Sequence, residues 1–237
     1  MPDPLAVRRR EAEWMDEPGA DPEQLRRSLA FIRRVNQLLG YTRATLHHLE
    51  RFSRSWTRGE RIEIVDFATG SADIPRAILQ WAAKRGFDVR VTGMDLHPTT
   101  AAEAVAEGGD EGGRLRVVRG DVLAPPFDAG SFDYAITAMF LHHLDDAAAV
   151  RVLATMGRLA RRGVIAADLL RHRRAYFWIK LLTLAANPMV RHDAPVSVAQ
   201  SFSESEVLRM REAAGLEFCT FFRHFGHRWV LAGEKRN

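Results

Sequence analysis

The stretch Ile64–Pro75, IVDFATGSADIP, decides the fold of this 237-residue chain. A branched apolar run leads to Asp66, and the chain then passes through small residues before a helical pattern begins near Ile74. Such a run is typical of a buried strand, and small residues after it let the backbone approach a ligand closely. The stretch therefore predicts a strand that ends at a ligand, which is a dinucleotide, a phosphate or another small molecule.

The sequence that follows alternates between strand-like and helical patterns. Strands are expected at 62–67, 89–94, 115–118, 134–139 and 164–167, with helices between them at 74–85, 99–106 and 146–159. Crossovers of this length join parallel strands, with helices on both faces of the sheet. The pattern therefore predicts an α/β, doubly wound sheet that is mostly parallel.

The end of the chain departs from this alternation. A helix with a capping box is expected at 203–214, and strands are expected at 218–223 and 228–232. The gap between these two strands is too short for a crossover, so they must form an antiparallel hairpin. The complete prediction is a Rossmann-like, seven-stranded sheet whose last strand runs against the others.

Two further segments frame the expected sheet. Residues 1–58 carry the helix start Asp21-Pro22 and helical repeats that break near Gly40 and again after Trp56, which predicts an N-terminal helical cap. Residues 59–237 are expected to form one domain. Its insertion, residues 168–202, is interpreted as a lid or pocket wall, with a helix that merely packs on the core as the alternative.

Composition excludes several classes of protein. The single cysteine, Cys219, rules out an internal disulfide, and no apolar segment follows Arg8–Arg10, so we expect no secretory signal and a cytoplasmic protein. The apolar run at 175–190 is too short for a membrane span. Residues 59–165 hold 12 basic and 15 acidic groups, so the net charge of +4 does not predict nucleic-acid binding. A small-molecule partner is expected, to a monomer or a homodimer.

Two glycine-rich templates were compared with the loop after Asp66. The dinucleotide pattern G-x-G-x-x-G fails at its third position, where Asp73 would repel a pyrophosphate. The pattern acidic-x-G-x-G-x-G fits from Asp66 to Ala72, with Ala68 and Ala72 in place of two glycines. With the expected fold, this stretch resembles motif I of the class I S-adenosylmethionine-dependent methyltransferases.

Three more stretches fit that family in the same order. They are VTGMD (91–95), GDV (120–122) and SFDY (131–134), the last of which leads into the strand that ends before His142 and His143. In this family the acids after the second and third strands lie at the ribose and near the adenine. The resemblance implies that S-adenosylmethionine, with S-adenosylhomocysteine as product, is bound by Asp66, Ala68, Thr69, Gly70, Asp95, Leu96, Asp121, Val122, Thr137 and Met139.

His142 and His143 follow the fourth strand, where methyl group and acceptor would meet. An imidazole has a pKa suited to a general base, so this pair is the catalytic candidate, with packing and hydrogen bonding as its alternative role. No metal is expected. Activity would be methyl transfer to a hydroxyl of an aromatic, polyketide-derived or quinone-like acceptor.

Acceptor contacts are expected from the insertion, at Tyr176, Trp178, Arg191, His192 and Asp193. Carbon methylation of a quinone-type ring and a non-catalytic binding module remain open as alternatives. A nicotinamide-dependent oxidoreductase is disfavoured by Asp73 and by the terminal hairpin.

Overall fold

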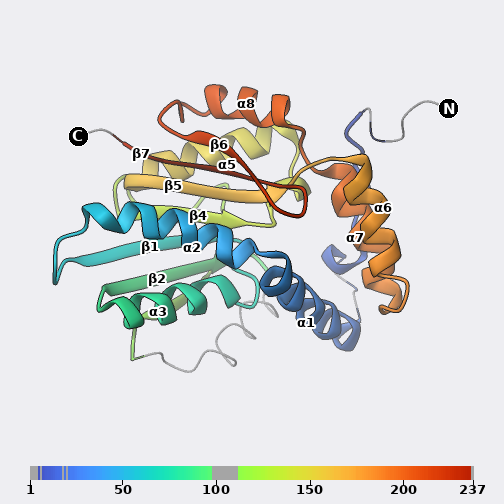
Figure 1. The fold of residues 1–237 in the computed structure, drawn as a ribbon, viewed down its shortest axis with the longest axis horizontal. Helices are drawn as coiled ribbons and strands as arrows, with labels where there is room; N and C mark the ends of the chain where they lie inside the picture. Colours follow the sequence, from blue (N-terminus) through green and yellow to red (C-terminus); the bar gives the residue numbers. More distant parts are fainter. Residues whose placement is uncertain (1–4, 6, 18, 20, 98–111, 236–237) are drawn as a thin grey trace.

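One sheet of seven strands organises the chain (Figure 1). The computed structural model describes all residues except 1–4, 6, 18, 20, 98–111 and 236–237, so the helix expected at 99–106 lies outside the described residues. The strand order is β3-β2-β1-β4-β5-β7-β6. The strands are β1 (Arg61–Phe67), β2 (Asp88–Asp95), β3 (Leu115–Arg119), β4 (Phe132–Ala138), β5 (Ala160–Leu169), β6 (Thr220–His224) and β7 (Arg228–Glu234).

Strand directions confirm the expected fold class. β1 to β5 pair in parallel, whereas β7 pairs antiparallel with both β5 and β6. The order reverses at β1, between β2 on one side and β4 on the other, and ligands of open α/β sheets bind beyond the carboxyl ends of the strands at such a point.

Helices cover both faces of the sheet. The helices and 3-10 turns of the described residues are η1 (Trp14–Asp16), α1 (Pro22–Leu39), α2 (Tyr41–Phe52), η2 (Ser53–Ser55), α3 (Asp73–Arg85), η3 (Leu141–His143), α5 (Asp146–Leu159), α6 (Arg173–Leu182), α7 (Pro188–Gln200) and α8 (Glu204–Ala213). In Figure 1, α2 and α3 lie in front of the sheet, and α5 and α8 lie behind and above it. Each face has its own apolar core.

The position of α2 differs from the expected division at residue 58. Tyr41, Leu49 and Phe52 of α2 are fully buried in the same core as Ile64 of β1 and Val230 of β7. This helix is therefore a layer of the main domain. Of the residues expected to form a cap, only α1 and the segment before it lie at the end of the sheet.

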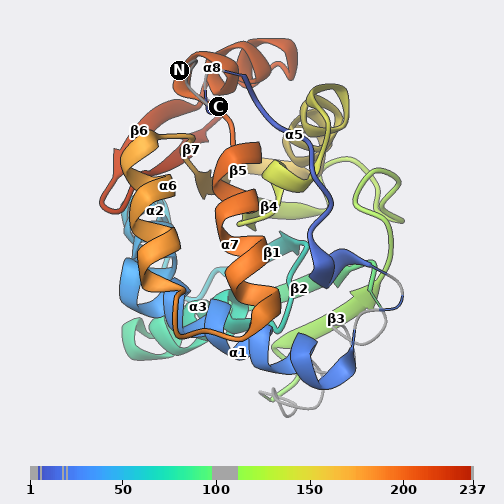
Figure 2. The ribbon, with the colours of Figure 1, turned by 90° about the vertical axis from the view of Figure 1, so that its right-hand side faces the viewer.

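That end of the sheet is covered by α1, α6 and α7, which Figure 2 shows facing the viewer. α7 packs against α1, α6, η1 and η3, so it lies at the centre of this cover. Asp168 was expected to begin the insertion, but it belongs to β5 and pairs with Trp229 of β7. Its strand is longer than the apolar run predicted because hydrogen bonding to β7 extends it to Leu169.

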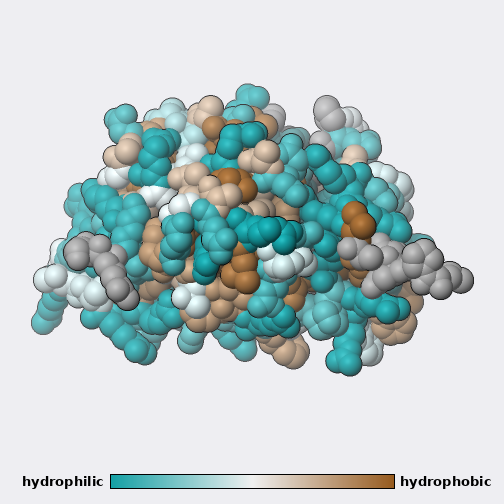
Figure 3. Space-filling model, turned by 90° about the horizontal axis from the view of Figure 1, so that it is seen from above, coloured by the Kyte–Doolittle hydropathy of each residue, from teal (hydrophilic) through white to brown (hydrophobic). Residues whose placement is uncertain are grey.

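The outer surface is ordinary for a globular protein. The face that carries α8 is mainly hydrophilic, with apolar residues in scattered groups (Figure 3). Among the described residues, no helix has the length and apolarity needed to cross a membrane.

Gly233 of β7 provides a test of the hairpin. A Cβ at this position would lie 2.2 Å from the backbone oxygen of Phe218 and 2.6 Å from Cα of Cys219. Backbone atoms cannot rotate away as a side chain can, so we expect Gly233→Ala to lower the free energy of unfolding by about 1–3 kcal/mol. Urea denaturation measures this change.

Gly19→Ala is the matched control, because a Cβ there meets nothing within 4 Å. We expect a change within about 0.5 kcal/mol for it. Equal urea denaturation midpoints for the two variants would contradict the close approach of β7 to the residues before β6.

Candidate functional site

The loop after β1 turns through three residues with left-handed backbone. Ala68, Gly70 and Ala72 have φ angles of 53°, 55° and 56°. These are the three positions at which the motif I pattern has glycine, so the pattern reflects a backbone requirement. Alanine in this region costs free energy that glycine does not, and such strain is concentrated at ligand sites. Thr69 fixes the turn, since its N–H donates to Met94 O (3.0 Å).

Asp95, at the end of β2, is bonded to the same loop. Its Oδ2 accepts from Gly70 N (2.9 Å) and its Oδ1 accepts from His97 N (3.0 Å). Gly93 lets β2 approach the loop, because a Cβ there would lie 2.7 Å from Thr69 Oγ1. Asp95 remains partly exposed and lines the main cavity.

Asp66 is a buried carboxyl group at the floor of this loop, with 3% of the residue exposed. Burial raises its pKa to about 8, the negative charges of Asp73 and Asp95 act in the same direction, and a hydrogen bond from Thr69 Oγ1 (2.7 Å) opposes them. Asp66 is therefore protonated at neutral pH unless a cation comes close to it.

Most of the other expected cofactor residues also line the main cavity. Leu96, Asp121, Val122 and Met139 do so, and Met139 has a left-handed backbone with φ of 57°. Thr137 does not: it is buried and donates to Phe67 O (2.9 Å), so it ties β4 to β1. Its position on a buried strand explains why it faces the sheet and not the ligand.

His142 is held rigidly by Asp168. The carboxylate accepts from the backbone N of His142 (2.9 Å) through Oδ2, and its Oδ1 lies 2.7 Å from His142 Nδ1. Asp168 is fully buried and also accepts from its own neighbour, Leu169 N. A carboxylate that receives backbone N–H groups acts as acceptor, so Nδ1 of His142 carries the proton and Nε2 keeps a lone pair.

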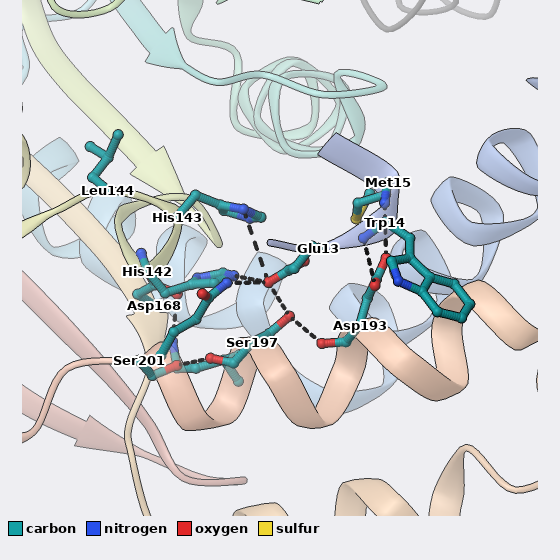
Figure 4. Close-up of polar contacts among 12 residues, drawn as sticks. Glu13, Trp14, Met15, His142, His143, Leu144, Asp168, Asp193, Ser197 and Ser201 are labelled. Atoms are coloured by element: carbon teal, nitrogen blue, oxygen red, sulfur yellow. Dashed lines mark hydrogen bonds and ion pairs between the residues drawn. The ribbon is translucent and has the colours of Figure 1, made fainter. Parts of the chain in front are cut away.

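Nε2 of His142 faces Glu13, which the sequence did not single out (Figure 4). Glu13 is 3% exposed, and its Oε1 lies 3.8 Å from His142 Nε2 and 4.0 Å from His143 Nδ1. Ser197 Oγ (2.8 Å) and Gln200 Nε2 (2.6 Å) of α7 donate to the same oxygen. A glutamate in a charged segment gives no sequence signal of this kind, because its partners are more than a hundred residues away.

The segment around Glu13 is fastened to α7 and to the turn after β4. Asp193 accepts from Trp14 N (2.9 Å) and Met15 N (3.1 Å). Arg8 donates to the carbonyl oxygens of His142 (2.9 Å) and Leu144 (2.6 Å). Asp193, which was expected to contact the acceptor, lines the cavity, but its carboxylate already accepts these two backbone hydrogen bonds from the N-terminal segment.

The other expected acceptor contacts divide into two groups. Trp178 lines the main cavity, whereas Tyr176, Arg191 and His192 do not. Tyr176 lies under Lys180 on another side of α6, and His192 stacks on Trp14 with ring centroids 4.1 Å apart. Arg191 is exposed. Of the expected polar cluster, His192 and Asp193 support the N-terminal segment, and only Asp193 also lines the cavity.

All these parts meet in one cavity of about 1430 Å³. It extends from the loop after β1, past the ends of β2 and β4, to the inner sides of α1, α6 and α7. Pockets that bury one small ligand measure about 300–1000 Å³, so this cavity has room for a cofactor and a second molecule.

Residues 64–163 match the family model of a methyltransferase domain. Over these residues the chain has the sequence pattern of a methyltransferase domain. The matched segment begins in β1 and ends in β5, so it holds the loop after β1, Asp95, Asp121 and His142. A search of curated protein sequences found no match.

Solved structures share the fold at low identity. A methyltransferase from Aquifex aeolicus that depends on S-adenosylmethionine is 16% identical, with a TM-score of 0.59, and the match covers 90% of this chain and 98% of that one. Magnesium protoporphyrin IX methyltransferase from Synechocystis, with bound S-adenosylhomocysteine, is 13% identical. Its TM-score is 0.57, and the match covers 83% of this chain and 84% of that one. The plantazolicin methyltransferase BpumL, also in complex with S-adenosylhomocysteine, is 11% identical. Its TM-score is 0.69, and the match covers 94% of this chain and 93% of that one.

S-adenosylmethionine is the cofactor that the family resemblance implies, and the cavity residues fit it. A Cβ on Gly70 would point into open space, so the loop leaves room for a ligand against its backbone. Asp95 and Asp121 give this end of the cavity carboxylates, which suit a molecule with a sulfonium and an ammonium group and would repel a pyrophosphate, and a cation close to Asp66 would favour its charged form as well.

The raised pKa of Asp66 predicts a pH dependence of stability. Between its ordinary value of 3.8 and about 8, the folded chain holds a proton that the unfolded chain has lost. The free energy of unfolding therefore falls as pH rises through this window, by up to about 1.4 kcal/mol per pH unit. We expect Asp66→Asn to remove that part of the slope in urea denaturation at pH 5 to 8. Identical slopes for the two proteins, without added cofactor, would contradict it.

Proposed function

We propose that this methyltransferase transfers the methyl group of S-adenosylmethionine to a hydroxyl group of a small aromatic, polyketide-derived or quinone-like acceptor. The observation that carries this proposal is the single cavity that joins the cofactor loops to a second, mainly apolar chamber. One ligand alone would leave a large part of its volume empty, and a transferase must hold both reactants together.

Apolar side chains form the wall of the second chamber. They come from the helices that cover the end of the sheet: Leu25 and Phe31 of α1, Trp178, Ile179 and Leu182 of α6, and Val190 and Val198 of α7. Such a wall favours an acceptor with an aromatic or aliphatic body. In this proposal, the insertion and the N-terminal segment close over the acceptor from two sides.

One group of polar side chains in the second chamber lies close together. Glu13, His142, His143 and Ser197 line the cavity where η3 meets α7. In this proposal, an acceptor bound against the apolar wall directs its hydroxyl group toward them, because His142 Nε2 and the Glu13 carboxylate lie together there. Apolar pockets with a few convergent polar groups are the usual form of a small-molecule site.

Methyl transfer needs the acceptor atom in line with the methyl group and free of its proton. When bound, S-adenosylmethionine supplies an electrophilic methyl group. The chain positions both reactants, an effect worth as much as about 7–11 kcal/mol, and the lone pair of His142 Nε2 points toward the acceptor end. Asp168 fixes the orientation of that imidazole and would stabilise its positive charge after it takes a proton.

Incubation with methyl-labelled S-adenosylmethionine tests the proposed activity. A panel of phenols and hydroquinones should become labelled at oxygen, and the same compounds with all hydroxyl groups already methylated should not. Labelling of the methylated panel at carbon would replace oxygen by carbon as the acceptor atom. Binding of the cofactor without any transfer, across both panels, would favour a binding module and overturn the proposal.

Asp95 tests the placement of the cofactor. Asp95→Ala removes a carboxylate that supports Gly70 N and is available to the ribose hydroxyls, so we expect it to weaken S-adenosylmethionine binding by about 1.5–3 kcal/mol in calorimetry. Asp88→Ala, at the other end of β2, is the control and should leave the affinity unchanged. Unchanged affinity in Asp95→Ala, with intact folding, would show that the cofactor lies elsewhere.

Trp178 and its neighbour Phe177 test the acceptor wall. Trp178 lines the cavity, whereas Phe177 is 63% exposed and lies outside this cavity. We expect Trp178→Ala to raise the acceptor's KM several-fold with little change in S-adenosylmethionine affinity, because a large apolar contact is lost. Phe177→Ala should leave both unchanged. Equal effects of the two substitutions would argue against α6 as an acceptor wall.

A further inference from the structure

Glu13, His142 and His143 lie together at the buried end of the acceptor chamber. General base catalysis by His142 gives the other two side chains no role. We propose that Glu13, His142 and His143 bind a divalent transition-metal ion, with Zn²⁺ as the representative, and that this ion binds the acceptor's oxygen. The site itself stands on the geometry of these residues. Its role toward the acceptor rests on the proposed function.

The distances among the three side chains suit one shared ion. Zn²⁺ binds imidazole nitrogen and carboxylate oxygen at about 2.0–2.2 Å, so two of its ligand atoms lie at most about 4 Å apart. Glu13 Oε1 lies 3.8 Å from His142 Nε2 and 4.0 Å from His143 Nδ1. All three ligand atoms lie within 4.8 Å of one another, so a small inward movement would place them around one ion.

Hydrogen bonds fix the directions of two of the ligand groups, His142 and Glu13. His142 presents Nε2 because its Nδ1 is bonded to Asp168, the carboxylate–histidine arrangement that commonly backs a metal ligand. Glu13 is oriented by Ser197 Oγ and Gln200 Nε2, two donors on successive turns of α7. Figure 4 shows Glu13 between the two imidazoles and this face of α7.

Charge also favours a cation here. Glu13 is almost completely buried, and its described contacts are with a serine, a glutamine and two histidines. Serine and glutamine are neutral, and an imidazole is charged only when protonated. A buried carboxylate is costly unless it is paired or coordinates a metal, so an ion at this point would satisfy it without protonated histidine.

The ligand types indicate which ion fits. Two imidazole nitrogens and one carboxylate oxygen suit Zn²⁺, Co²⁺ or Fe²⁺, whereas Mg²⁺ and Ca²⁺ prefer oxygen ligands. Three protein ligands leave a position open, as in catalytic zinc sites, and this cluster lines the cavity. An acceptor hydroxyl bound there would lose its proton to water. Its oxygen would then form a bond to the methyl carbon while the methyl–sulfur bond of S-adenosylmethionine breaks, and S-adenosylhomocysteine would leave. In this arrangement Nε2 of His142 holds the ion and does not take the proton itself.

A second pair of histidines provides a competing site within the same chain. His48 Nε2 and His224 Nε2 lie 3.2 Å apart, and burial lowers the pKa of both imidazoles, so both are neutral and able to bind a metal. No carboxylate is described in contact with this pair, so a negative charge like that of Glu13 is missing there. Variants at His224 therefore separate the two sites.

Metal titration of the full chain, stripped with a chelator and free of both substrates, tests the site. We expect calorimetry to show one Zn²⁺ per chain. Glu13→Gln should weaken this binding at least about 100-fold, and Ser197→Ala about 10-fold, because supporting residues commonly contribute 10–100-fold. Glu11→Gln, an exposed glutamate of the same segment, should have no effect. Mg²⁺ should not displace Zn²⁺.

Spectroscopy of the unmodified protein keeps the test independent of whether Glu13→Gln folds normally. Co²⁺ should give visible absorption bands that disappear when Zn²⁺ is added, and X-ray absorption at the metal should show two imidazole ligands. Absence of Zn²⁺ binding, unchanged binding in Glu13→Gln, or loss of binding in His224→Asn but not in Glu13→Gln would each overturn the site. Metal binding without any methyl transfer would contradict the proposed function and leave the site standing.

Discussion

The contact between Asp168 and His142 is the constraint on which the acceptor half of the molecule depends. Asp168 lies next to the last residue of β5 and has no exposed surface, and its two oxygens are bonded to the backbone N and the Nδ1 of His142. This fixes the turn after β4 and the direction of Nε2 at the same time. Glu13 and the α7 face then have a fixed partner to pack against. A carboxylate in this place is costly to bury, and its hydrogen bonds to His142 and Leu169 offset part of that cost.

The two halves of the cavity are built from contacts of very different range. The cofactor half uses residues that follow β1, β2 and β3, and the parallel ladder places those chain segments side by side. The acceptor half joins Glu13 to Ser197 and Gln200, at separations of 184 and 187 residues. Methyltransferases with one cofactor and different acceptors are the expected result of such a division, since the second half changes without disturbing the first.

The same division explains what the sequence predicted. Hydrophobic runs and turn residues are local signals, so they located all seven strands, the terminal hairpin and the loop at Ala68–Ala72. Thr137 was expected at the cofactor, and the structure bonds it to Phe67 O outside the cavity lining; a residue on a strand buried on both faces gives no indication of its direction. Tyr176 and Trp178 lie on different sides of α6, because the side chains of residues two positions apart on a helix point about 200° away from each other. No residue of α6 is buried, so its sequence does not show which side meets the cavity. Glu13 depends wholly on long-range packing.

One consequence concerns the segment that carries Glu13 and is attached to α7 through Asp193. The acceptor chamber is complete only in molecules in which this segment is docked, whereas the cofactor loops do not include it. Apparent affinity for the acceptor is therefore the intrinsic affinity multiplied by the docked fraction, and affinity for the cofactor is not scaled in this way. On the proposed function, a molecule that competed for Asp193 or displaced Trp14 from His192 would reduce turnover of the acceptor and leave cofactor binding unaffected.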